Sequence, residues 1–179
     1  MQQRFFLFLF ALGFLLTACQ PEQKGTEIIW DEWGVPHIYS DNNEDLFYAH
    51  GWAQMHNHAN LILQLYGTSR GRAAEYFGAG NLQSDMMVHS LGIPEKATEW
   101  WEAQNDEMKA NFSAFVRGLN DYASAHPEAI AEDRQAVLPV TETDVTSHFL
   151  FVVGTRFVGG NDLGLVANYE ELGSNTYAV

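Results

Sequence analysis

The stretch EIIWDEWGVPHIYSDNNEDLFYAHGWAQ, residues 27–54, organises the amino-terminal part of the chain. Its first half is rich in Ile, Trp, Val and Tyr, and Gly34 interrupts it. Such residues are typical of strands and glycine suits a tight turn, so we expect two short strands, at 27–33 and 35–40. Pro36 cannot donate a backbone hydrogen bond, which favours an edge or a bend in the second strand.

A helical pattern begins directly after these strands. Residues 41–43 (Asp-Asn-Asn) offer several N-cap side chains, and the acidic pair that follows suits a first helical turn. Apolar side chains then recur at helical spacing between residues 43 and 66, and we expect Gly67 to end this helix. The recurring apolar positions are Phe47, Trp52, Met55, Ala59, Ile62 and Leu65.

Helical patterns also dominate the rest of the chain. We expect short helices at 70–77 and 82–91 and one long helix at 95–124, which His126-Pro127 ends. A last helix follows, capped by Thr143 or Asp144. With strands at the two ends of the chain, these helices predict an α+β fold that is mostly helical.

Composition and charge exclude one broad class of partner. The chain has 179 residues, 46% of them hydrophobic, which is enough to build a core. Its formal net charge is −14, from 23 acidic and 9 basic residues. Binding to nucleic acid needs a basic face, and this sequence contains none, so we expect no nucleic-acid partner.

The first residues have the features of a secretion signal. A basic start is followed by an apolar run at 5–16, which is too short to span a bilayer. Leu16-Thr17-Ala18-Cys19 resembles a bacterial lipobox, which implies cleavage before Cys19 and its lipidation. We therefore expect a signal peptide at 1–18, a lipid-anchored tether at 19–26, and a place on the cell envelope (periplasm or outer membrane in a Gram-negative cell). The alternative is an ordinary signal with an incidental cysteine.

The dipeptide Gly173-Ser174 is the strongest candidate for chemistry. A serine at a new chain terminus carries a hydroxyl nucleophile and an amine base on one residue. The amine has a reference pKa of about 7.7–8.0, so much of it is neutral near pH 7–8. Taken alone, however, Gly-Ser is common in turns.

Several ordered motifs give this dipeptide a context. They are GVPHI at 34–38, DLFYAHGWAQ at 45–54, GRAAE at 71–75 and the junction GSNTYA at 173–178. In this order they resemble the penicillin acylase family, a branch of the N-terminal-nucleophile (Ntn) hydrolases. The resemblance covers roughly residues 26–179. One departure is Tyr177, where the junction more commonly has Trp.

The resemblance implies a subunit organisation. It assigns 27–173 to the small subunit of an Ntn-hydrolase αββα fold, including any C-terminal spacer, and 174–179 to the first residues of the large subunit. The chain would then be a precursor truncated just after the catalytic serine. Its main partner would be its own large subunit, and the fragment alone would be inactive.

The resemblance also implies a reaction. Ser174 would attack the carbonyl of Gly173, and hydrolysis of the resulting ester would free the Ser174 amine. The exposed serine would then hydrolyse the amide bond of N-acylated amines. Candidate substrates are β-lactam side chains, N-acyl homoserine lactones and acylated peptides. The donors that stabilise the oxyanion would come from the large subunit.

Calcium is the cofactor that the resemblance suggests, bound through oxygen ligands, and no organic cofactor is expected. Asp162 is the nearest candidate ligand and Glu170 and Glu171 are the next, but none is assigned. The same region lines the acyl pocket in relatives, which makes Arg156 and Phe157 candidate pocket residues.

Two other functions remain open. His50, Gln54 and His58 share one helical face, with His56 nearby, which would suit a metal-dependent amidase, although structural histidines are the better explanation. The chain could instead belong to a non-catalytic surface lipoprotein that binds a ligand. Such a protein has no reason to keep a cleavable serine at 174.

Two further side-chain groups have a structural explanation. We expect His37 to fix the turn beside it, as a polar side chain in the GVPHI block. The charged residues at 70–75, which are Arg70, Arg72 and Glu75, are expected to form a surface network on one helix, of little energetic weight.

Overall fold

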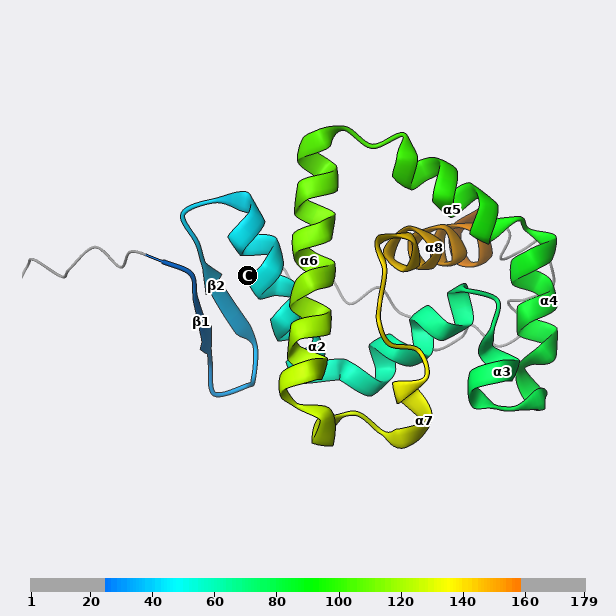
Figure 1. Ribbon diagram of the computed structural model, residues 1–179, viewed down its shortest axis with the longest axis horizontal. Helices are drawn as coiled ribbons and strands as arrows, with labels where there is room; N and C mark the ends of the chain where they lie inside the picture. The colour runs from blue at the N-terminus through cyan, green and yellow to red at the C-terminus, as the bar shows by residue number, and fades with distance from the viewer. Residues whose placement is uncertain (1–24, 159–179) are drawn as a thin grey trace, which may run out of the picture.

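The computed structural model describes residues 25–158 and is mostly helical, with one small sheet at its side (Figure 1). Strands β1 (Glu27–Trp30) and β2 (Pro36–Tyr39) pair antiparallel, with Ile28 opposite Ile38. The predicted hairpin and the mostly helical α+β class are confirmed. The strand expected at the C-terminal end lies outside the described residues.

The helices follow the hairpin along the chain. They are α2 (Asn43–Ser69), α3 (Ala73–Phe77), α4 (Leu82–Ser90), α5 (Ile93–Glu102), α6 (Asp106–Ala125), α7 (Glu132–Gln135) and α8 (Glu142–Val152). Short 3₁₀ turns, η1 (Ala79–Asn81) and η2 (Pro127–Ala129), precede α4 and α7, and a π-helical turn, η3 (Val153–Val158), continues α8.

The hairpin turn is organised by one carboxylate. Asp31 accepts hydrogen bonds from the backbone amides of Trp33 and Val35, both at 2.9 Å. These two bonds, the Val35 bond foremost, lower the pKa of Asp31. Gly34 takes a positive φ of 76°, and its carbonyl accepts a hydrogen bond of 3.1 Å from Asn57 on α2. The turn is therefore fixed both internally and to the first helix.

Helix α2 begins where the sequence predicts and ends later. Asn42 is its N-cap, and its side chain accepts the Asp45 amide at 2.9 Å. The prediction that Gly67 ends the helix is wrong, because the helix continues to Ser69. A Cβ at Gly67 would lie 2.8 Å from the Phe77 ring, so the glycine makes room for an aromatic side chain rather than terminating the helix.

The two longest helices of the described part, α2 and α6, cross at a point where each helix has a glycine. An ideal Cβ on Gly51 would overlap the carbonyl oxygen of Phe115, and one on Gly118 would overlap that of Tyr48. Each helix therefore offers bare backbone to the other at this point. The Tyr48 hydroxyl also donates to Asp121 across the crossing, at 3.1 Å.

The main core forms around this crossing and extends under the chain that follows α6. Its aromatic members include Tyr122, whose ring packs edge to face on the ring of Trp52, with the two ring centroids 5.3 Å apart. The buried cluster consists of Met55, Ala59, Leu63, Tyr66, Val116, Leu119, Tyr122, Ala123, Ile130, Val137 and Val140.

The single long helix expected at 95–124 is wrong: it is two helices, α5 and α6, with a break at 103–105. Asn105 adopts an extended conformation, and its side chain accepts the Met108 amide at 2.8 Å. A capping asparagine followed by acidic Asp106 and Glu107 starts a new helix here. Apolar spacing alone does not reveal this break, because it continues across the boundary.

Two asparagines hold the irregular chain between α6 and α8 in place. The Asn60 side chain donates to the Ala129 carbonyl at 3.2 Å and accepts the Ala131 amide at 2.8 Å. The Asn120 side chain makes the same pair of bonds with the backbone of Val140, both at 2.8 Å. These bonds satisfy backbone groups that have no partner within a helix, and they fix the course of the chain up to the start of α8.

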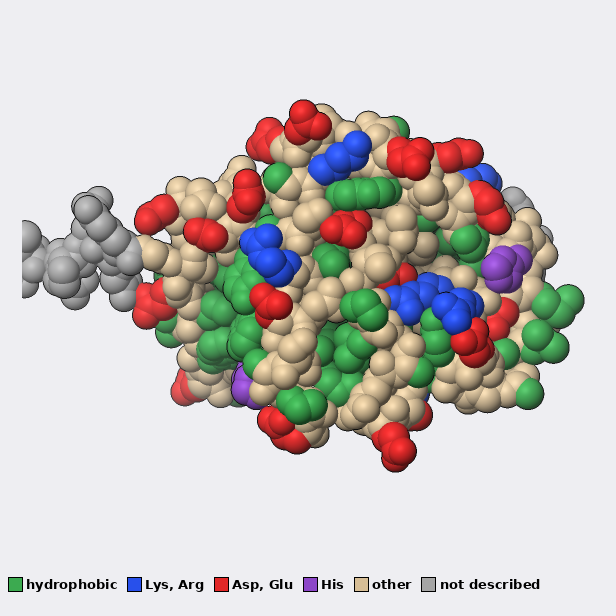
Figure 2. Space-filling view, viewed as in Figure 1, with side chains coloured by type: hydrophobic (Ala, Val, Ile, Leu, Met, Phe, Trp, Pro, Cys, Tyr) green, Lys and Arg blue, Asp and Glu red, His purple; other side chains and the backbone are tan. Residues whose placement is uncertain are grey.

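Acidic side chains are spread around the rim of the face shown in Figure 2, and basic side chains form only a few separate groups on it. Within residues 25–158, no helix is both long and apolar enough to cross a membrane.

Candidate functional site

Helix α8 is the last α-helix within residues 25–158, and a capping box starts it. Thr141 is its N-cap, not Thr143 or Asp144 as expected. Asp144 instead occupies the third helical position and accepts from the Thr141 amide at 2.6 Å and the Thr141 hydroxyl at 2.9 Å. The Thr-x-x-Asp spacing, read as a capping box, would have placed the cap correctly.

The far end of α8 passes into the π-helical turn η3. There the Thr155 hydroxyl, almost fully buried, donates to the Phe151 carbonyl at 2.6 Å. The candidate pocket residues Arg156 and Phe157 belong to η3, but their side chains are not among those described.

The other predicted site residues lie outside residues 25–158. They are Cys19, the candidate calcium ligands Asp162, Glu170 and Glu171, and the junction Gly173-Ser174. The structure therefore describes a segment that precedes the predicted nucleophile in the sequence, and not the nucleophile itself.

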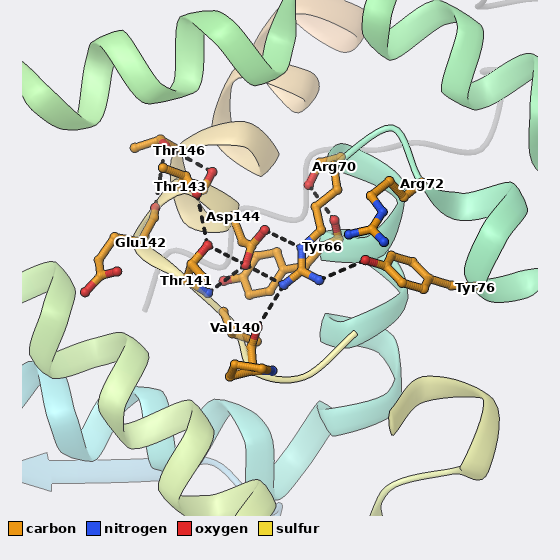
Figure 3. A network of polar contacts seen from close by, with 12 residues as sticks. Tyr66, Arg70, Arg72, Tyr76, Val140, Thr141, Glu142, Thr143, Asp144 and Thr146 are labelled. Atoms are coloured by element: carbon orange, nitrogen blue, oxygen red, sulfur yellow. Dashed lines mark hydrogen bonds and ion pairs between the residues drawn. The ribbon is translucent and has the colours of Figure 1, made fainter. Parts of the chain in front are cut away.

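Arg70 and Asp144 form a buried ion pair at the start of α8 (Figure 3). The guanidinium donates through Nε to Oδ1 at 2.6 Å and through Nη2 to Oδ2 at 2.7 Å. Its remaining contacts are the Pro139 carbonyl at 3.0 Å and the Tyr76 hydroxyl at 3.2 Å. The two side chains are 16% and 4% exposed. Asp144 is thus buried and Arg70 is largely buried, and both charges are satisfied by partners.

This network shifts the ionisation of its members. Burial alone would lower the pKa of Arg70, but the hydrogen bond and charge of Asp144, with the Tyr76 contact, outweigh it and raise the pKa above its ordinary value. Burial raises the pKa of Tyr66 well above its ordinary value, and the charge of Asp144 adds to this effect. Arg70 therefore stays charged and Tyr66 stays neutral at physiological pH.

The expected surface network on one helix is only partly correct. Arg72 and Glu75 do form an exposed pair, with Nη2 and Oε1 2.6 Å apart and side chains 52% and 57% exposed. The hydrogen bond from Arg72 lowers the pKa of Glu75. Arg70 belongs to a different network, because α2 ends before it and Gly71, at a φ of 70°, turns the chain.

An open cleft of about 660 Å³ lies beside the ion pair. Arg70, Tyr76, Pro139 and Asp144 line it, together with Thr98 of α5. Each guanidinium at the cleft already has a carboxylate partner, Asp144 or Glu75. Both guanidiniums of the cleft are therefore paired, and the Arg70–Asp144 pair joins the end of α2 to the start of α8.

The histidines on α2 do not converge. His58 has a non-helical φ of −142°, which kinks the helix and breaks the regular spacing from His50. The ring centroids of His50 and Phe115 are 5.5 Å apart, and those of His56 and Trp30 are 4.7 Å apart. Burial lowers the pKa of His50. Among residues 25–158, no three His, Cys, Asp or Glu side chains are grouped to hold a metal ion.

The histidine of the GVPHI block has a contact that fits the expected structural role. His37 Nε2 lies 3.3 Å from Asp31 Oδ2, on the same carboxylate that organises the hairpin turn.

Comparison with known proteins identifies what the chain resembles. The family model described as penicillin amidase matches residues 25–163. An acyl-homoserine lactone acylase, PvdQ, of Pseudomonas fluorescens Pf-5 is 32% identical over 122 residues, which are 64% of this chain and 16% of that protein. A penicillin acylase 2 proenzyme of Pseudomonas sp. SE83 is 32% identical over 98 residues, which are 53% of this chain and 12% of that protein.

The fold has a solved counterpart. A thermostable penicillin G acylase from Alcaligenes faecalis superposes with a TM-score of 0.65 at 21% identity, over 76% of this chain and 75% of that chain. The chain spans less than a fifth of the length of the two curated relatives, 16% and 12% respectively.

Proposed function

The chain belongs to the penicillin amidase family, and from that membership we propose that residues 27–173 form the small subunit of an acylase precursor with Ser174 as its nucleophile. One observation carries the proposal: the family match over 25–163 is followed closely by Gly173-Ser174. Residues 174–179 then begin the large subunit, and any spacer between the subunits lies before Ser174.

Maturation would begin with Ser174 acting on its own peptide bond. Its hydroxyl attacks the Gly173 carbonyl, the bond to the Ser174 nitrogen breaks, and an ester forms with the Ser174 oxygen. Water hydrolyses this ester, which leaves the carboxylate of Gly173 and regenerates the Ser174 hydroxyl beside the amine that the first step freed. A glycine before the serine suits this step, because it allows backbone conformations that a Cβ would block.

The matured serine would then hydrolyse a substrate amide. The Ser174 amine, through a water molecule, accepts the hydroxyl proton as the oxygen attacks the substrate carbonyl, and the same proton can pass to the departing amine. Water releases the acyl group from the ester. Donors from the large subunit, the partner in this scheme, stabilise the oxyanion.

The substrate is an N-acylated amine in this proposal. The relatives are named as acyl-homoserine lactone and penicillin acylases, and both names denote removal of an acyl group from an amine. We therefore propose acyl homoserine lactones, β-lactam side chains and acylated peptides as the substrate class. Arg156 and Phe157, on η3, are proposed to line the acyl pocket.

Calcium binding stays a proposal that the described residues do not test. The described part of the chain groups no three acidic or histidine side chains for a metal ion. The candidate oxygen ligands, Asp162, Glu170 and Glu171, lie beyond it. No step of the mechanism above passes through a metal.

The activity is tested with the full-length precursor after maturation. Purified protein is incubated with a long-chain N-acyl homoserine lactone and with a benzyl-type penicillin, and free amine and free acid are measured by mass spectrometry. The proposal predicts equal amounts of acid and amine with the lactone or β-lactam ring intact. Ring-opened product that retains the acyl group, or ligand binding without turnover, would contradict it.

Lipid anchoring at Cys19 is a separate proposal, supported by Leu16-Thr17-Ala18-Cys19. Cells grown with a fatty-acid analogue should incorporate the label into the wild-type protein and not into Cys19→Ala. The variant should also leave the membrane fraction, because a lipid chain contributes about 0.8 kcal/mol for each buried CH₂ group. Equal labelling of the two proteins would show that the cysteine is incidental.

A further inference from the structure

The hairpin of β1 and β2 is apolar on both of its faces. Its inner face, where Ile28 lies opposite Ile38, packs against α2. Side chains alternate between the two faces along a strand, so the odd-numbered positions form the outer face. Two of these, Ile29 and Tyr39, are 45% and 56% exposed. An antiparallel hairpin that keeps one face in solvent normally carries polar side chains there, so this outer face has the composition of a covered one.

The apolar surface continues onto the hairpin turn. Trp33 is 82% exposed, the highest value among the large hydrophobic side chains of residues 25–158, and Val35 is 51% exposed. The backbone amides of both residues donate to Asp31, which fixes the turn that presents them. Tryptophan and tyrosine are typical anchors of protein–protein interfaces. The turn and the outer face therefore form one surface suited to a protein partner.

The charge around this surface restricts the kind of partner. Residues 25–69, which include the hairpin and α2, contain six acidic residues and no Lys or Arg. The six are Glu27, Asp31, Glu32, Asp41, Glu44 and Asp45. Figure 2 shows acidic side chains at the hairpin end of the molecule. An anionic membrane would be repelled, and a second copy of the same surface would place like charges opposite one another. The surface instead suits a partner that is apolar at its centre and basic at its rim.

We propose that the outer face of the hairpin, formed by Ile29, Trp33, Val35 and Tyr39, is a docking surface for the large subunit that begins at Ser174. This inference rests on the proposed function, which supplies that subunit. The chain spans only 16% and 12% of two curated relatives, so most of their length has no counterpart in it. A partner of that size can cover the outer face.

Cleavage before Ser174 gives such a surface a task. It removes the peptide bond between the subunits, and afterwards they stay together only through the contacts between them. The one cysteine of the chain is Cys19, whose sulfur is consumed if it carries lipid. An apolar surface that stays covered after cleavage then keeps the small subunit bound.

A photo-cross-link identifies what covers the surface. Full-length protein is made with p-benzoylphenylalanine in place of Tyr39, an aromatic replacement at an exposed position, and is irradiated after maturation. Mass spectrometry then locates the cross-linked peptides. The proposal predicts cross-links to residues that follow Ser174. Cross-links only to residues 1–173, to a second small subunit or to lipid would overturn it, and so would the absence of any cross-link.

A matched pair of variants tests whether the surface is buried. Ile29→Val and Ile29→Thr have nearly the same shape, are both β-branched, and differ only in a methyl and a hydroxyl group. In solvent the two variants would behave alike, because neither group loses water. Beneath the large subunit the hydroxyl is buried, so Ile29→Thr should release its small subunit about tenfold faster than Ile29→Val.

Release is followed by native mass spectrometry on matured enzyme in dilute urea, and circular dichroism confirms that both variants are folded. Equal release rates for Ile29→Val and Ile29→Thr would overturn the docking surface. If either variant fails to mature, the cross-link from position 39 decides alone.

The cross-link also separates this inference from the proposed function. It does not require cleavage, so it should also form in the uncleaved Ser174→Ala precursor. A wild-type precursor that is never cleaved before Ser174 but gives the cross-link overturns the proposed function and leaves the docking surface in place. A precursor that is cleaved there without giving the cross-link overturns the docking surface alone.

Discussion

Replacing Gly118 by alanine is expected to destabilise the protein strongly, although helix propensity alone predicts the opposite. In an exposed helix the change would stabilise by about 1 kcal/mol. Here the new Cβ would overlap the Tyr48 carbonyl oxygen and lie 2.9 Å from the Trp52 amide nitrogen. Both atoms are backbone of the facing helix and cannot rotate away, so α2 and α6 must separate.

We expect Gly118→Ala to lower the free energy of unfolding by about 3 kcal/mol, at the upper end of overpacking costs. Thermal unfolding of the full-length protein measures this. Gly80→Ala is the matched control, since no heavy atom lies within 4 Å of a Cβ there.

Gly51→Ala gives a second test of the same crossing, because its Cβ would overlap the Phe115 carbonyl oxygen. The double variant should be less destabilised than the sum of the two single variants, since helices already forced apart by one methyl accommodate the other. If Gly118→Ala unfolds at the wild-type temperature, the close crossing of α2 and α6 is wrong.

Ser174→Ala is expected to abolish acylase activity, because it removes the oxygen that attacks both the Gly173 carbonyl and the substrate. The precursor should remain a single chain. Ser174→Cys should still be cleaved, since a thiolate is a strong nucleophile. The matured thiol should nevertheless hydrolyse amides poorly, because the geometry for a water-bridged amine is set for a hydroxyl.

These two variants are compared for activity and for chain length on the same preparations. Circular dichroism of Ser174→Ala should match that of the unprocessed wild type, which excludes misfolding as the cause of inactivity. Hydrolysis by Ser174→Ala at the wild-type rate would show that another residue is the nucleophile.

Local sequence signals predicted most of the fold. The hairpin around Gly34 and the start of α2 at Asn42 follow from turn and cap chemistry, which acts over a few residues. The break at Asn105 had such a signal too, but the continuing apolar periodicity outweighed it in the prediction of one helix. Gly67 shows the converse: a residue that often ends helices instead admits the Phe77 ring.

The candidate site was less predictable for a physical reason. The family resemblance depends on short motifs that can be read directly, and the match over 25–163 confirms it. The Arg70–Asp144 pair has no local signal, because its partners are 74 residues apart and meet only through packing. Arg70 was therefore grouped with its sequence neighbours Arg72 and Glu75, although Gly71 turns the chain between them.

The most direct measurement of the central claim is the amino-terminal sequence of the larger product of the full-length precursor. The account predicts that it begins Ser-Asn-Thr-Tyr, which corresponds to Ser174 onward, and that Ser174→Ala expressed in parallel yields no such product. A larger product that begins at any other residue, or a Ser174→Ala chain that is cleaved at the same place, would contradict it.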